Sequence, residues 1–178
     1  RFPSGVSVVR VAAMAGADGA QRCLRVADTS TAETIYWMHI WDDLPRIREV
    51  TRLRTIGLDP RGATYEDLLR ESVNINCRLC VMYAQVEETE ADAEYVAVLW
   101  DAMNHKPLAS FRIPAVLPDA TREKCAKEPD GDRAATREAE FLALADLRKS
   151  VRDAMWDLVY ADQASPTTQP NPWTEYDY

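Results

Sequence analysis

Tyr95-Val-Ala-Val-Leu-Trp100 and Leu108-Ala-Ser-Phe-Arg-Ile113 are two strand-like runs, and the turn-rich segment Asp101-Ala-Met-Asn-His-Lys-Pro107 separates them. Apolar runs on both sides of a short polar segment predict a β-hairpin. A strand candidate precedes this hairpin, and a long amphipathic helix candidate, residues 136–162, follows it. We therefore predict an α/β (α+β) two-layer sandwich: a mixed or antiparallel sheet with a C-terminal β-hairpin and a long C-terminal helix packed on one face.

The size and charge of the chain limit what it can be. It has 178 residues, of which 47% are hydrophobic and 28% charged, as is typical of a globular domain. We assign residues 1–162 to a single α/β domain and residues 163–178 to a Pro-rich extended tail. A net charge of −8 without a basic stripe argues against nucleic acid as a partner. The sequence has no apolar run long enough for a transmembrane segment.

In the N-terminal half, four segments are expected to form strands. Residues 6–13 and 21–27 flank a glycine-containing turn and could pair as a hairpin. Ile35-Tyr-Trp-Met-His-Ile-Trp41 is rich in aromatic and β-branched residues, which favours a strand, although a short helix stays open. Residues 47–56 are interpreted as a strand because Gly57 soon ends the pattern.

The central segments give clearer signals. Thr64-Tyr-Glu-Asp67 is similar to a capping box and predicts the start of a helix. One face of this helix carries residues at helical spacing, namely Tyr65, Leu68, Leu69, Ser72 and Val73. Leu79-Cys-Val-Met-Tyr83 is almost continuously apolar, which is typical of a strand buried on both faces. Residues 118–133 are expected to form a charged loop before the terminal helix.

The four cysteines leave the redox setting open. Cys23, Cys77, Cys80 and Cys125 could form two disulfides in three pairings, and an even number suits an oxidising compartment. Cys77 and Cys80 form a CxxC, so a metal or thiol-redox site is an alternative hypothesis. The pair lies where a helix leads into a strand, however, and not at a helix N-terminus. Two separate buried thiols are therefore favoured.

Motifs of catalysis are missing from the sequence. It contains neither a GxSxG elbow nor a phosphate-binding glycine loop, and the acidic segments 87–92 and 128–132 do not match a calcium-binding loop. His39 lies among aromatic residues, as expected of a core or boundary histidine, and His105 lies at the tip of the predicted hairpin. We therefore expect a protein that is not an enzyme and has no catalytic residue, cofactor or metal.

Two segments are candidates for partner contacts. Arg46, Arg48, Arg52 and Arg54 would share one face of a strand, because alternate residues point the same way. The tail carries Trp173, Tyr176 and Tyr178, aromatic side chains that bury a large area at a small cost in entropy.

A family resemblance accompanies these patterns. Residues 68–86, a helix followed by a buried strand, resemble a step in the α/β domain of bacterial curli-secretion-type lipoproteins and of the N-terminal domain of the Tol-system β-propeller protein (TolB). Residues 95–113 are similar to the hairpin that follows in those domains, and residues 44–54 resemble uncharacterised envelope lipoproteins. Asn76-Cys77-Arg78 stands where these families have Gly-Ala-Asp. The resemblance covers about residues 44–162 and implies an extracytoplasmic, non-catalytic role in assembly or secretion.

These observations lead to one functional hypothesis and two alternatives. The hypothesis is a non-enzymatic accessory or scaffold subunit of the bacterial cell envelope, periplasmic or lipid-tethered, that binds protein partners in a larger assembly. A start at Arg1 rather than at Met would fit a removed leader. The alternatives are a small-molecule, metal or thiol-redox domain centred on Cys77 and Cys80, and a cytosolic regulatory domain.

Overall fold

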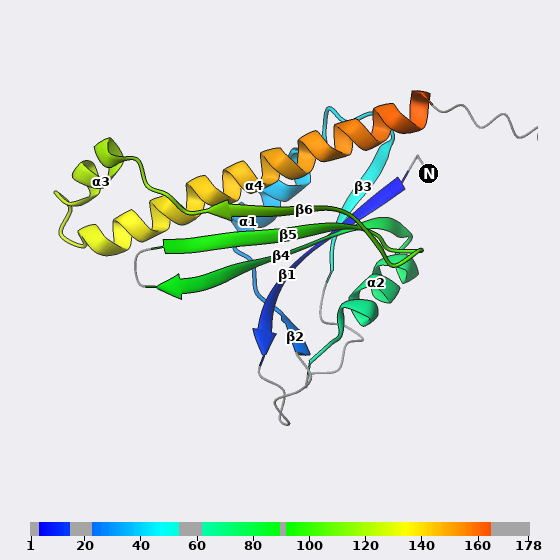
Figure 1. Ribbon diagram of the computed structural model, residues 1–178, viewed down its shortest axis with the longest axis horizontal. Coiled ribbons are helices and arrows are strands. Elements are labelled where there is room, and N and C mark those ends of the chain that lie inside the picture. Colours follow the sequence, from blue (N-terminus) through cyan, green and yellow to red (C-terminus); the bar gives the residue numbers. More distant parts are fainter. Residues whose placement is uncertain (1–3, 15–22, 54–61, 90–91, 165–178) are drawn as a thin grey trace, which may run out of the picture.

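In the part of the chain that the structure describes, a six-stranded mixed sheet and four helices make up the fold (Figure 1). The structure, a computed structural model, describes residues 4–14, 23–53, 62–89 and 92–164. In chain order the elements are β1 (Ser4–Met14), β2 (Cys23–Val26), α1 (Thr31–His39), β3 (Ile47–Arg52), α2 (Tyr65–Asn74), β4 (Cys77–Thr89), β5 (Asp92–Asp101), β6 (Lys106–Pro114), α3 (Asp119–Cys125) and α4 (Gly131–Ala164).

The strands run in the order β2-β1-β4-β5-β6, and β3 also pairs with β1. β1 is parallel to both β3 and β4, whereas β1–β2, β4–β5 and β5–β6 are antiparallel. The first half of β1 pairs with β3 and its second half with β2, so these two short strands share one edge of β1. The predicted α/β sandwich with a mixed sheet is confirmed.

Helices lie on both faces of this sheet. α1 and α4 cover one face, where α4 packs along β5 and β6, and the shorter α2 covers the other face at β4 (Figure 1). The alternation of β4 explains this arrangement: Leu79, Val81 and Tyr83 face α1 and α4, whereas Cys80 and Met82 face α2. The long C-terminal helix on one face is confirmed, and α2 adds a partial layer on the opposite face.

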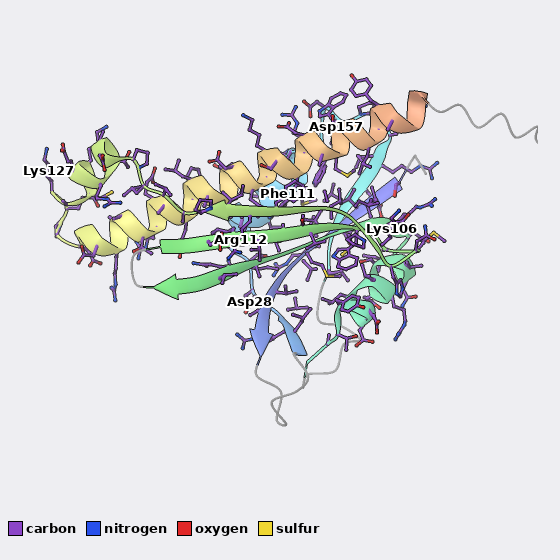
Figure 2. All side chains as sticks on the ribbon, in the orientation of Figure 1. Asp28, Lys106, Phe111, Arg112, Lys127 and Asp157 are labelled. Atoms are coloured by element: carbon purple, nitrogen blue, oxygen red, sulfur yellow. The ribbon has the colours of Figure 1, made fainter. Side chains whose placement is uncertain are left out.

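The hairpin that suggested the fold is present in the structure. β5 and β6 pair antiparallel, with Val98 opposite Ser110. His105 in the turn has a backbone φ of 50°, the left-handed region that a tight turn requires. Neighbouring residues of β6 point to opposite faces: Phe111 packs towards α4, whereas Arg112 pairs with Glu94 at 2.6 Å (Figure 2).

Other predicted elements are also confirmed. β1 and β2 form the expected antiparallel pair, and β3 is a strand. The capping box of α2 is complete, because Thr64 Oγ1 accepts from the Asp67 N–H and the Asp67 carboxylate accepts from the Thr64 N–H. Residues 79–83 of β4 are all buried, as a strand covered on both faces requires.

The prediction that residues 35–41 form a strand is wrong, because most of this segment belongs to α1. Ser30 Oγ accepts a hydrogen bond from the Glu33 N–H and caps the helix. Trp37 and Trp41, four residues apart, then stack on the same buried side with ring centroids 6.4 Å apart. The helix start Ser30-Thr-Ala-Glu33 thus outweighed the β propensity of the aromatic run. The loop expected at residues 118–133 also contains a short helix, α3.

Candidate functional site

A groove between α1 and α4 has a volume of about 400 Å³. We call it the α1–α4 groove. α4 contributes residues that recur every three to four positions and so share one face of the helix. They are Phe141, Ala145, Arg148, Lys149 and Arg152, and they face Tyr36, His39, Ile40, Asp42 and Asp43 from α1 and the turn after it.

One end of the groove is apolar and accessible. The rings of Tyr36 and Phe141 meet edge to face, with centroids 6.0 Å apart, and both remain about half exposed. Ile35, next to Tyr36 on α1, is 50% exposed. Phe141 lies at the edge of the buried face of α4. Neighbouring large apolar side chains in contact with solvent are typical of interaction sites.

Arg148 is the most deeply buried of the charged residues that line the groove. It is only 5% exposed, and its guanidinium carbon lies 4.6 Å above the centre of the Tyr36 ring. Its Nε is buried without a hydrogen-bond partner among the described residues. Burial lowers the pKa of Arg148, and the nearby charge of Glu33 opposes that change. A buried cation with an unused N–H group is costly, so its retention points to a role.

The polar end of the groove is held by ion pairs. Arg152 pairs with Asp43 and thereby joins α4 to the turn after α1. His39 Nδ1 lies 2.9 Å from Asp42 Oδ2, and the His39 side chain is 70% exposed. The expectation that His39 is a core or boundary histidine is therefore wrong. The change from strand to helix explains this, since His39 ends α1 on the side away from Trp37.

A buried polar network lies beneath α1 and α4, and its members satisfy one another. Glu33 accepts hydrogen bonds from Tyr83 Oη at 2.8 Å and from Arg10 Nη1 at 3.2 Å. Arg10 Nη2 donates to Gln85 Oε1 at 2.9 Å, and Gln85 Nε2 donates to Glu140 Oε1 at 2.8 Å. Burial, followed by the charge of Glu33, raises the pKa of Tyr83. These pairings are those of a structural network, because the polar groups are directed towards each other.

A second hollow, bordered by Arg10, Trp37, Arg52 and Tyr83, has a volume of only about 20 Å³. That volume admits about one water molecule. It is therefore too small for an organic ligand.

The predicted arginine cluster is only partly brought together. Arg48 and Arg52 share a face of β3, and Arg52 turns towards the small hollow beneath α1. Arg46 precedes the strand with a φ of 73°, so strand alternation does not extend to it, and the prediction of a shared face is wrong for this residue. Arg54, Trp173, Tyr176 and Tyr178 lie outside the described residues, and their contacts stay predictions.

Cys77, Cys80 and Cys125 are buried free thiols, and the side chain of Cys23 lies outside the described part of the structure. The predicted disulfides thus find no support among the three cysteines described. Burial raises the pKa of Cys77 and raises that of Cys80 to about 11. Both thiols therefore stay protonated at neutral pH, which disfavours thiol-redox chemistry. The described residues also contain no group of three or more His, Cys, Asp or Glu side chains that could hold a metal ion.

Comparisons with known proteins do not assign the chain to a family. No protein-family model matches it, and no curated protein does. The crystal structure of protein XCC0632 from Xanthomonas campestris, which carries the family label DUF330, is similar over 92% of this chain and 88% of that chain, with 12% identity and a TM-score of 0.40. A likeness at this level carries no argument about function. None of the helices in the described ranges is long and apolar enough to cross a membrane.

Sequence reasoning missed the residues that define the groove. Tyr36 and Arg148 belong to helices whose relative position no local pattern encodes. One signal was available, however: the cap formed by Ser30 and Glu33 could have identified α1. A helical reading of residues 31–39 would have placed Tyr36 and Ile40 together on one face.

Proposed function

We propose that this protein is a non-enzymatic accessory or scaffold subunit of the bacterial cell envelope, and that it acts through protein–protein contacts at the α1–α4 groove. The observation that carries the proposal is the coincidence of a hollow with exposed apolar side chains. Tyr36 and Phe141, which both line the groove, leave an accessible apolar surface there. A surface of this kind fits a protein partner, whose side chains could fill the hollow and cover the rim.

The pairing of the buried charges supports a binding role over catalysis. A catalytic acid or base is commonly a perturbed group that borders a cleft. Here Glu33 is directed towards Arg10 and Tyr83 inside the protein, and not towards the α1–α4 groove. Cys80 is buried beneath α2 on the opposite face of the sheet.

The envelope setting of this proposal rests on the family resemblance of residues 44–162. Two further sets of residues are assigned to partner contacts. They are the arginines Arg46, Arg48, Arg52 and Arg54, and the tail residues Trp173, Tyr176 and Tyr178.

Site-specific photo-crosslinking in the native cells tests the proposal. An aromatic photoreactive amino acid replaces Phe141 in the groove or, as a control, Met103 in the β5–β6 turn, which is 60% exposed. We expect one defined crosslinked partner from position 141 and none from position 103. Failure to crosslink at position 141, or the same adducts from both positions, would contradict a partner surface at the groove.

A further inference from the structure

We infer that the α1–α4 groove receives a carboxylate side chain of the partner protein, which binds the Arg148 guanidinium while a neighbouring apolar side chain rests on Tyr36 and Phe141. This inference rests on the proposed function and specifies the chemistry of the partner.

The first argument is the unsatisfied state of Arg148. The side chain is 5% exposed, lines the groove, and keeps its Nε–H without an acceptor among the described residues. The Glu33 carboxylate accepts hydrogen bonds from Arg10 and Tyr83. Its negative charge acts on the Arg148 guanidinium from a distance, but the structure records no hydrogen bond between the two side chains. Buried charged donors in proteins are normally paired, and because Nε itself is buried, an acceptor in the groove would meet the Nη groups and give this cation a partner.

The second argument is the direction from which an acceptor can approach. One flat face of the guanidinium is covered by the Tyr36 ring at 4.6 Å. An anion therefore has to meet the guanidinium at its edge, where the N–H groups lie in one plane. A carboxylate is planar and matches that edge with two oxygens.

The third argument is the charge distribution of the groove. Arg148, Lys149 and Arg152 supply positive charge, whereas Asp42 and Asp43 supply negative charge at the opposite side. A polyanion such as a nucleic acid would meet both aspartates. A single carboxylate next to an apolar residue avoids them and uses the surface formed by Tyr36 and Phe141.

The groove also suits a protein segment better than a free anion. A hollow of about 400 Å³ is far larger than one carboxylate, and its apolar end is already accessible. A side chain pair such as Phe–Glu would place its ring against Phe141 and its carboxylate against Arg148.

Arg148→Met tests the inference within the crosslinking experiment. Methionine keeps a long apolar side chain and removes every donor, so we expect the crosslink yield at position 141 to fall about tenfold, the loss of one charge-assisted hydrogen-bonded contact. Arg137→Met is the matched control, because Arg137 is exposed on the same helix and does not line the groove. An unchanged yield in Arg148→Met would overturn the inference and leave the partner surface itself intact. A missing crosslink in the unmodified chain would reject both.

A second measurement identifies the bound group with purified protein. Titration with the peptides acetyl-Phe-Glu-Phe-amide and acetyl-Phe-Gln-Phe-amide, followed by NMR shifts of the α4 amides, compares a carboxylate with its neutral analogue. We expect the Glu peptide to bind about tenfold more tightly, and this preference to vanish in Arg148→Met. Equal binding of the two peptides would overturn the inference. So would saturation by acetate alone at the same concentration, because the site would then take any small anion.

Thermal unfolding of Arg148→Met separates binding from folding. Replacement of a buried, unpaired cation by an apolar side chain is expected to leave stability unchanged or raised. Phe141→Ala provides a variant that does not depend on this result, since Phe141 is 46% exposed. It should weaken binding of the Glu peptide about threefold, while the preference for Glu over Gln persists. A variant with unchanged affinity would contradict the apolar half of the inference.

Discussion

The two faces of the sheet are built in opposite ways. On the α2 face, Leu68 and Leu69 are fully buried against Val9, Cys80 and Met82. The buried hydroxyls of Ser7 and Ser72 lie 2.7 Å apart there, and Trp100, which packs against the same cluster, keeps its Nε1 without a partner among the described residues. On the α1 and α4 face, the protein buries Glu33, binds it to Arg10 and Tyr83, and keeps Arg148 without a hydrogen-bond partner for its Nε.

This difference separates a stabilising face from a face with a recognition role. Apolar packing stabilises a fold at little cost, whereas each buried charge has to recover its lost hydration from its partners. The α2 face buries mostly apolar side chains, and its unpartnered polar atom, Trp100 Nε1, carries no charge. The α1 and α4 face buries charged groups next to the α1–α4 groove, and departures of this kind are expected near functional sites.

The largest effect should come from the α2 face. Leu68→Ala removes a side chain with no exposed area, so we expect a loss of about 2–5 kcal/mol in the free energy of unfolding. Urea denaturation measures it. Val73→Ala on the same helix is the matched control, because Val73 is 37% exposed and should cost about 0.5 kcal/mol or less. Similar losses for the two variants would mean that α2 is not anchored as the structure shows.

A smaller effect is expected in the buried polar network. Glu33→Gln keeps the shape but removes the charge that pairs with Arg10, so the free energy of unfolding should fall by about 1–3 kcal/mol. Urea denaturation at several salt concentrations measures this loss. Glu123→Gln, on an exposed position of α3, should change nothing measurable. A neutral outcome for Glu33→Gln would show that the network does not stabilise this face.

The smallest effect is alkaline destabilisation, which compares the two faces in one titration. The pKa of Cys80, on the α2 face, rises from 9.0 to about 11 through burial. The pKa of Tyr95, on the other face, rises from 10.0 to about 12, also mainly through burial. In each case the unfolded chain loses its proton first. The stabilisation is therefore complete below the unfolded pKa and is lost as the pH rises through the folded value.

For Cys80 this loss amounts to about 1 kcal/mol between pH 8 and pH 10, and Tyr95 contributes at higher pH. Urea denaturation at each pH measures it. Because burial raises the pKa of Cys77 as well, Cys80→Ala should reduce the early decline without abolishing it, whereas Tyr95→Phe should leave the early part unchanged. An identical pH profile in Cys80→Ala would show that this thiol is not shielded from solvent.

Local signals predicted much of the fold. The alternation and apolar runs of β4, β5 and β6, the cap at Thr64 and the apolar stripe of α4 all reflect neighbours in the sequence, so they could be read without the structure. The error at α1 has the same origin, because the aromatic run of residues 35–41 was weighed more heavily than the cap that precedes it. Of the proposed contact residues, Arg48 and Arg52 follow strand alternation, whereas Arg46 does not.

By itself the sequence indicated an α/β sandwich with a mixed or antiparallel sheet, its C-terminal hairpin and the long helix that covers one face, because periodicity and caps act over a few residues. Only the tertiary structure decided which charges became buried and where the groove lies. Tyr83 meets Glu33 across 50 positions of the chain, and Arg152 meets Asp43 across 109. Contacts of that separation depend on how α1 and α4 settle on the sheet, and no local pattern carries that information.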